Sequence, residues 1–326
     1  MHCPKLNELP PPPPGKIGWP WTAESKQLPD LMPGGSPWPR VSIVTPSYNQ
    51  GQFIEETIRS VLLQGYPDLE YIVIDGGSSD GSVDIIRKYE PWLAHWVSEP
   101  DRGQANAINK GFRACSGQIM AWLNSDDCFT QGAVQHIVAY LEANSAAKVV
   151  CGFRQTIVAH RENRRYNSVH LRPDRFSLSR WCYISQETTF WRRSVWETVG
   201  ELDETYQYAL DYDFWQRMLT AQYQFHLLPR FIGLFRGHPE SKGARCSEIR
   251  TTELARIYSR YLHTNKGEME LRSEISLAWL RRMKMIRILG RAGFLNYFLL
   301  ARAIVSMLSL PESKIPRNSE PSPRPN

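Results

Sequence analysis

Short apolar runs alternate with amphipathic segments over residues 40–150, and this alternation limits the fold more than any other feature of the chain. Residues 41–45, 71–74 and 118–123 are short and mainly apolar, as buried parallel strands are. Residues 53–62 carry apolar side chains at helical spacing. Because strands and helices alternate at the spacing of right-handed βαβ units, we expect an open, mostly parallel but mixed α/β sheet flanked by helices.

The remainder of the chain is predicted to be less regular. Residues 149–158 and 225–235 are typical of hairpin strands, and a helix is expected near residues 211–220. The first residues are rich in proline, which excludes helix and central strand and favours a tail that packs through Trp19, Trp21 and Trp38. We expect four parts: a Pro-rich tail at 1–39, an α/β domain at 40–250, a C-terminal helical extension at 251–310 and a disordered tail at 311–326.

Three polar clusters follow directly after predicted strands, at residues 45–49, 75–78 and 124–127. In an open α/β sheet, ligands bind beyond the carboxyl ends of the strands. We therefore expect the three clusters to converge on one edge of the sheet and to form a single site.

The third cluster contains two adjacent carboxylates, Asp126 and Asp127. Neighbouring carboxylates disfavour each other's ionisation unless a cation or hydrogen-bond donors offset the charge. A hard divalent ion such as Mg²⁺ or Mn²⁺, bound together with diphosphate oxygens, suits such a pair. The alternative is a helix cap before Thr130, where Asp and Asn are also common.

The net charge of +6 agrees with an anionic partner, but the basic excess is concentrated near the C-terminus. Residues 275–310 contain no acidic side chain and several Lys and Arg, with apolar side chains on one helical face. The apolar stretch is too short to span a bilayer, so we expect a basic amphipathic helix lying on an anionic membrane surface. The alternative is a helix that packs on the protein's own core. Nucleic-acid binding is not expected, because no recognised motif is present.

The six cysteines are predicted to be unpaired thiols. They lack C-x-x-C or zinc-type spacing, and the N-terminus lacks the apolar segment of a signal peptide. A reducing compartment follows, so we expect a cytoplasmic protein at the inner face of the cell membrane.

Six motifs, in order, resemble those of family-2 glycosyltransferases. They lie within residues 41–240, at 45–49, 60–64, 71–81, 99–104, 107–111 and 123–127. The resemblance implies the GT-A fold, which is a nucleotide-binding α/β sheet, and transfer that inverts anomeric configuration. It also implies a nucleoside-diphosphate sugar donor, with UDP-sugars favoured, and a divalent metal.

The resemblance assigns donor contacts to residues on the expected edge of the sheet. These are Thr45, Pro46, Tyr48, Asp75, Gly103, Gln104, Asn109, Lys110 and Asp126. The metal-holding carboxylate is Asp127. Asn106 departs from the pattern, because many relatives carry Asp there.

A later motif, at residues 211–217, resembles the helix start that carries the family's catalytic base. It implies that Asp211 is the base, although Leu210 occupies a place that is acidic in many relatives. Asp213 is the rival, and a carboxylate that only stabilises the helix dipole is the alternative for both.

Residues 235–242 are similar to the late histidine loop of the family. His238 is expected to bind metal or diphosphate, with Ser241 and Lys242 beside the phosphates; an ordinary loop histidine is the alternative. Gln186 and Glu187 are expected to face the acceptor.

The sequence thus predicts a glycosyltransferase that moves a sugar to a hydroxyl of a glycan or lipid-linked acceptor in polysaccharide assembly. One alternative is a sugar nucleotidyltransferase, but the Gly-rich basic loop of that class is absent after the first strand. The other is a non-catalytic carbohydrate-binding or scaffolding relative at the membrane.

Overall fold

The computed structural model describes residues 2–158, 164–170, 172–242 and 247–289. The chain divides into two compact units, Met1–Thr264 and Asn265–Asn326. The predicted disordered tail and most of the predicted membrane-binding segment lie outside the described residues.

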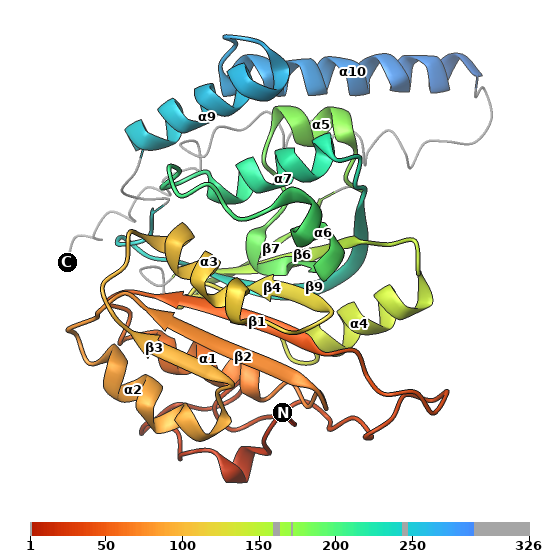
Figure 1. The fold of residues 1–326 in the computed structure, drawn as a ribbon. Coiled ribbons are helices and arrows are strands. Elements are labelled where there is room, and N and C mark those ends of the chain that lie inside the picture. Colours follow the sequence, from red (N-terminus) through yellow and green to blue (C-terminus); the bar gives the residue numbers. More distant parts are fainter. Residues whose placement is uncertain (1, 159–163, 171, 243–246, 290–326) are drawn as a thin grey trace, which may run out of the picture. The chain divides into compact units, whose positions relative to one another are not determined.

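Four parallel strands form one half of the sheet in the first unit, in the order β3-β2-β1-β4 (Figure 1). Their bounds are β1 Val41–Ser47, β2 Leu69–Asp75, β3 His95–Ser98 and β4 Ile119–Trp122. β1, β2 and β4 confirm the three strands predicted at residues 41–45, 71–74 and 118–123.

The other half of the sheet is mixed and continues β8-β6-β9-β5, with β7 paired to β6. Its bounds are β5 Cys128–Phe129, β6 Val149–Val158, β7 Arg164–Ser168, β8 Thr189–Arg192 and β9 Phe225–Gly237. β6 forms the expected hairpin with β7, but β9 is one long strand parallel to β6. The hairpin predicted for residues 225–235 was wrong because apolar alternation marks a strand without identifying its partner.

Helices cover both faces of the sheet (Figure 1). The helices α1, α2 and α4 bury aliphatic side chains against one face, whereas α3, α6 and α7 meet the other through aromatic rings such as Phe112, Trp122 and Phe214. The helix bounds are α1 Ile54–Leu62, α2 Ser82–Tyr89, α3 Gln104–Ala114, α4 Ala133–Ala143, α5 Arg175–Arg180, α6 Arg193–Val199 and α7 Leu210–Thr220. Short 3₁₀ turns are η1 Leu6–Glu8, η2 Glu90–Trp92 and η3 Gln186–Thr188.

A glycine lets α3 lie close to the sheet. A Cβ atom at Gly111 would stand 2.4 Å from Val44 Cγ1 on β1. A larger residue would push α3 off the strands, and the start of this helix would move away from the strand ends.

The proline-rich N-terminal segment packs on α1, as the tryptophans predicted. Trp21 is 6 % exposed, and the Trp19 indole donates to the Phe129 carbonyl at 2.9 Å. Arg59 of α1 is fully buried and donates to three carbonyls of this segment, those of Pro10, Pro20 and Trp21. The segment is therefore part of the folded unit.

Helix α9, Ser247–Leu262, belongs to the first unit, although the sequence assigned residues from 251 onward to the C-terminal extension. It buries Leu254, Ile257 and Tyr258, which gives it an apolar face within this unit. The second unit contains α10, Glu268–Leu289. In the part of the chain that the structure describes, no helix is long and apolar enough to cross a membrane.

The five described cysteines are unpaired thiols, as predicted. Four are buried and Cys182 is partly exposed. Cys246 lies outside the described residues.

Candidate functional site

The carboxyl ends of β1, β2 and β4 bring the three polar clusters to one edge of the sheet. Ser47 is in register with Asp75, and Asp75 with Ser98 of β3. Asp75 is fully buried and accepts hydrogen bonds from the N–H groups of Gly77 and Ser78 and from the Ser98 hydroxyl at 2.7 Å. The convergence predicted from the sequence is therefore present, and Asp75 holds the turn after β2 in shape.

The cluster after β1 is only partly turned toward solvent. Thr45 is buried and accepts a hydrogen bond from the Tyr71 hydroxyl at 3.0 Å, and Pro46 is buried beside it. Tyr48 is 62 % exposed, so its ring is available to a ligand. The predicted donor contacts thus separate into a buried pair and one exposed aromatic side chain.

Asp126, Asp127 and His238 meet at the end of β9. His238 Nε2 lies 3.0 Å from Asp126 Oδ2, and Asp127 Oδ1 accepts the N–H of Arg236 at 3.0 Å. The Phe53 ring lies 4.7 Å from the imidazole, centroid to centroid. The sequence therefore selected two segments, 110 residues apart, that the fold brings into contact.

The electrostatics of this cluster favour a cation. Burial, followed by the charges of Asp126 and Glu187, raises the pKa of Asp127 above its ordinary value, and a bound cation would oppose that shift. His238 Nδ1 is buried without a hydrogen-bond partner among the described residues. Two carboxylates and an imidazole are donors that suit Mn²⁺. Within the described ranges, however, no group of three or more His, Cys, Asp or Glu side chains is arranged to hold a metal, so the shell would need ligand oxygens.

Asp211 and Asp213 occupy the first turn of α7 but differ in their surroundings. In the described part of the chain, the Asp211 carboxyl accepts one hydrogen bond, from the N–H of Tyr212 at 2.7 Å. Burial is the main cause that raises the pKa of Asp211 to about 6. Asp213 is buried, paired with Arg217 at 2.9 Å and hydrogen-bonded by the Tyr261 hydroxyl at 2.8 Å. Asp211 is therefore the carboxyl with unused acceptor capacity.

A second carboxyl, Glu187 on η3, lies near Asp211. It is 3 % exposed, and its Oε1 has no hydrogen-bond partner in the described residues. Burial raises the pKa of Glu187, and its charge in turn raises that of Asp211. Gly233 of β9 faces it: a Cβ there would stand 2.5 Å from Glu187 Cγ.

Arg154 of β6 supplies the opposing charge. It pairs with Gly233 across the sheet, so its side chain projects on the face that Glu187 approaches. Its positive charge lowers the pKa of Asp127, Glu187 and Asp211. Arg154 Nε is buried without a hydrogen-bond partner among the described residues, and the guanidinium lies 4.9 Å from the Phe235 ring centroid.

The start of α3 contributes one predicted donor contact directly. Gln104 donates to Asn124 Oδ1 at 2.6 Å and accepts from Lys242 Nζ at 2.7 Å, which joins three of the predicted segments. Gly103, just before it, has φ of 113°, a conformation that favours glycine. Ser241 N–H donates to the His238 carbonyl at 3.0 Å in the same loop.

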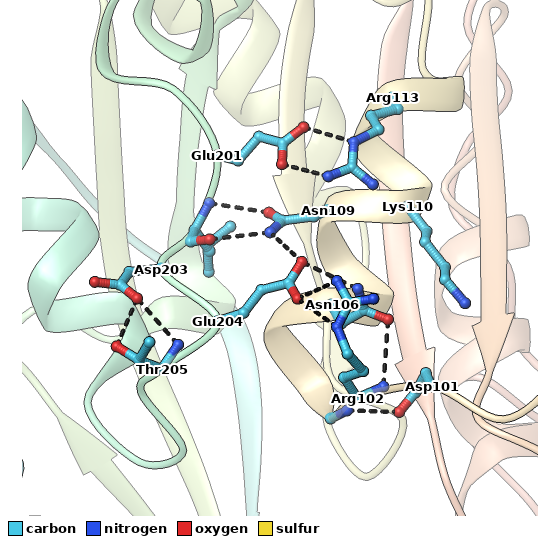
Figure 2. Close-up of polar contacts among 12 residues, drawn as sticks. Asp101, Arg102, Asn106, Asn109, Lys110, Arg113, Glu201, Asp203, Glu204 and Thr205 are labelled. Carbon is cyan, nitrogen blue, oxygen red and sulfur yellow. Dashed lines mark hydrogen bonds and ion pairs between the residues drawn. The ribbon is translucent and has the colours of Figure 1, made fainter.

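Asn109 and Lys110 are engaged away from this cluster. Asn109 is buried and exchanges hydrogen bonds with both backbone groups of Leu202. In Figure 2 its side chain faces the segment that carries Glu201 and Glu204. Lys110 forms an ion pair with Glu99 at 2.8 Å. The structure thus gives Asn109 a role in holding loop 201–209 against α3.

Sequence reasoning missed three charged residues at the site. Arg236 pairs with Glu56 of α1 at 2.9 Å and donates through Nε to the Asp126 carbonyl at 3.1 Å. Arg154 and Glu204 complete the set. Arg236 stands two residues before His238, so the motif already contained it, whereas nothing in the local sequence of Arg154 or Glu204 marks a site.

Comparison with known proteins identifies a family. A family profile described as Glycosyl transferase family 2 matches residues 42–198. An uncharacterized glycosyltransferase of Mycobacterium tuberculosis is 31 % identical over 182 residues, covering 54 % of this chain and 67 % of that protein. The putative teichuronic acid biosynthesis glycosyltransferase TuaG of Bacillus subtilis is 36 % identical over 118 residues, covering 35 % of this chain and 47 % of that protein. The chain spans between 47 and 68 % of the length of the curated relatives that it matches.

Solved structures show the same fold. The mannosyltransferase PcManGT from Pyrobaculum calidifontis, solved in complex with GDP-Man and Mn²⁺, superposes with a TM-score of 0.55 at 20 % identity, covering 86 % of this chain and 84 % of that one. The mixed sheet with helices on both faces is thus the predicted GT-A fold. Together with the matched profile and the mycobacterial relative, this architecture leads to one conclusion: the chain belongs to glycosyl transferase family 2.

Proposed function

We propose that the protein transfers a sugar from a nucleoside-diphosphate sugar to an acceptor hydroxyl, with inversion at the anomeric carbon, and that Asp211 is the base. The carrying observation is the contrast between two carboxyls on one helical turn. Asp213 is occupied by Arg217 and Tyr261, whereas Asp211 keeps acceptor capacity and has a pKa of about 6. A base whose pKa lies near the operating pH is effective in proton transfer.

The donor site that we propose lies along the edge formed by β1, β2 and β4. The exposed Tyr48 would contact the nucleoside, the buried Asp75 would hold the turn that lines the base pocket, and Asp126 would contact the ribose. Gly103, Gln104 and Lys242 would lie beside the diphosphate and sugar, and the hydrogen bond from Lys242 to Gln104 supports their acting together. Thr45 and Pro46 would shape the base pocket from beneath, and Asn109 and Lys110 would act by fixing α3.

Asp127 and His238, with Asp126 beside them, would hold a divalent cation. That cation would neutralise charge on the departing diphosphate. Its ligand shell would need diphosphate oxygens, as Mg²⁺ and Mn²⁺ sites commonly do. PcManGT was solved with GDP-Man and Mn²⁺, which supports such a metal for a protein of this fold. The donor base is proposed to be uridine on family resemblance alone.

Calorimetry on the purified protein tests this function. UDP-, GDP- and dTDP-sugars are titrated with and without Mn²⁺, into the wild type and into Asp127→Ala. We expect one donor class to bind in a metal-dependent manner, and the variant to lose this dependence. Release of nucleoside diphosphate from the bound donor separates an enzyme from a non-catalytic carbohydrate-binding relative. A donor affinity that changes neither on addition of Mn²⁺ nor in Asp127→Ala would contradict the proposed site.

The acceptor is proposed to be a glycan or a lipid-linked sugar, with the protein at the cytoplasmic face of the membrane. TuaG is described as acting in teichuronic acid biosynthesis, which supports a polysaccharide role. The membrane contact rests on the basic, acid-free composition of residues 275–310. Removal of residues 275–326 should abolish co-sedimentation with anionic liposomes. Unchanged co-sedimentation would contradict the membrane proposal. The proposed donor site does not depend on this result.

A further inference from the structure

Helix α9 holds the backbone that leads into α7. Glu253 of α9 is 8 % exposed, and its carboxylate accepts three backbone N–H groups. Oε1 accepts from Gln207 at 2.7 Å, and Oε2 accepts from Tyr208 at 2.9 Å and Ala209 at 2.8 Å. These are the last three residues before α7 begins, so Glu253 fixes the point from which that helix starts.

The first turn of α7 lacks a cap of its own. Ala209 occupies the N-cap position and offers no side-chain acceptor, although the N–H groups at a helix start need external partners. The Ala209 carbonyl accepts from the Asp213 N–H at 3.0 Å, so the turn that carries Asp211 is built directly on the residue that Glu253 holds. A carboxylate near this end also complements the helix dipole.

Other side chains of α9 contact loop 201–209 and the first turn of α7. Arg256 donates to the Thr205 hydroxyl at 2.8 Å and lies 3.6 Å from an Asp203 carboxylate oxygen. Tyr261 donates to Asp213 Oδ1 at 2.8 Å. Contacts therefore run from loop 201–209 to the turn containing Asp211.

The near end of loop 201–209 is fixed to α3. Figure 2 shows Glu204 facing Arg102, Asn106 and Asn109. Arg102 Nη2 donates to Glu204 Oε2 at 2.7 Å, and Asn106 Nδ2 donates to Oε1 at 3.0 Å. The loop therefore has fixed points at α3, beside the proposed donor site, and at α9. While Glu253 keeps its three hydrogen bonds, residues 207–209 at the C-terminal end of the loop are held in place. The first turn of α7, which carries Asp211, is held with them.

We propose that Glu253 is a positioning residue for Asp211, so that α9 is part of the catalytic unit and not of a separable C-terminal extension. This inference rests on the proposed function. Glu253 acts through backbone groups and does not touch the substrate.

The test compares Glu253→Gln with Glu248→Gln, the same substitution at an exposed position of the same helix. The amide introduced by Glu253→Gln would replace one acceptor oxygen with an NH₂ group that cannot accept an N–H donor. We expect kcat for the donor selected by calorimetry to fall by about 10- to 100-fold, because small displacements of reacting groups cost that much. Donor Kd should stay within about twofold, and Glu248→Gln should match the wild type.

Hydrogen exchange provides a readout that needs no turnover. Amides 207–209 should exchange faster in Glu253→Gln, whereas those of α3 should not change. The inference is overturned if exchange is unchanged, if kcat matches the control, or if kcat and donor affinity fall together with Tm. If the wild type releases no nucleoside diphosphate from any donor, the proposed function fails by itself. Exchange at 207–209 then still decides whether Glu253 holds the start of α7.

Discussion

At the scale of single residues, Asp211 is partly buried, and its carboxyl accepts one hydrogen bond among the described residues. Asp211→Asn removes the proposed base but keeps the side chain's shape, so we expect kcat to fall by about 100-fold or more with donor Kd unchanged. Steady-state kinetics with parallel calorimetry measures both. Unchanged turnover would contradict the assignment.

Asp211→Asn should lower kcat but should not lower the stability of the protein above neutral pH. Because the folded-state pKa of Asp211 is raised to about 6, the folded protein binds this proton more tightly than the unfolded chain. Its contribution to stability is therefore lost as pH rises through about 6. Asp211→Asn avoids that loss, so its Tm above pH 7 should equal or exceed that of the wild type.

The charges around Asp211 set its pH profile in opposite senses. Glu187 raises the pKa of Asp211 and Arg154 lowers it. Because the base must be ionised, kcat/KM should rise with pH through about 6. Glu187→Gln should move this acid limb to lower pH and Arg154→Gln to higher pH. Both pH profiles are measured with the same donor. Shifts in the same direction would show that the two side chains do not act through charge on Asp211.

At the scale of elements, the junction of α3 with loop 201–209 depends on an amide at position 106. Asn106 is 2 % exposed and donates to Glu204 Oε1 at 3.0 Å. Asn106→Asp would place two carboxylates together, so we expect a loss of about 1–3 kcal/mol at pH 8. The new pair would have a raised pKa, so the loss should grow as pH rises and diminish near pH 5.

Urea unfolding at both pH values measures this effect. Asn167→Asp is the matched control, since Asn167 is exposed and its side chain, among the residues that the structure describes, accepts one hydrogen bond, from Gln155 to Oδ1. Asn106→Asp combined with Glu204→Gln should recover most of the loss. No recovery would mean that repulsion at this contact is not the cause.

The elements that the sequence predicted correctly are those whose signal is local. Residues 41–45, 71–74 and 118–123 became parallel strands because a buried strand needs a short apolar run and little else. The pairing of β9 and the position of α9 depend on contacts between distant parts of the chain. Glu253 shows why: its partners are three backbone N–H groups, which leave no trace in residue type.

The same distinction applies to the candidate site. Family motifs marked Asp126 as a donor contact and Asp127 and His238 as metal ligands. The fold brings His238 into contact with Asp126, and Asp127 into contact with Arg236, two residues before His238. Arg154 was not found, since an arginine in a strand resembles a surface residue until its neighbours are known. Asn109 lay in a recognised motif but is used to hold a loop.

At the scale of the whole molecule, carbonyl groups of the N-terminal segment bind the buried guanidinium of Arg59 on α1. Deleting residues 1–21 would remove the carbonyls of Pro10, Pro20 and Trp21 from the fully buried Arg59. The Tyr89 hydroxyl, at 3.2 Å, would remain as a hydrogen-bond partner of Arg59. We expect a loss of about 3–5 kcal/mol, since a buried charge that loses most of its partners costs that much. Urea unfolding measures it. Adding Arg59→Met to the deletion should restore part of the stability. A deletion that costs less than about 1 kcal/mol would show that the segment only covers the surface.

Strand β9 has a consequence for how such a protein can change. It presents Gly233 to Glu187 and Arg236 to Asp127, and it ends just before His238. Each residue advances a strand by about 3.3 Å and reverses the direction of its side chain. Substitutions in the surrounding loops could alter the ligands while leaving these intervals intact. An insertion or deletion of one residue within β9 would instead displace the groups that face Glu187 and those that face Asp127 at once. The number of residues in β9 therefore sets the spacing of the groups at the site. We expect that number to tolerate change less well than the residue types in the surrounding loops.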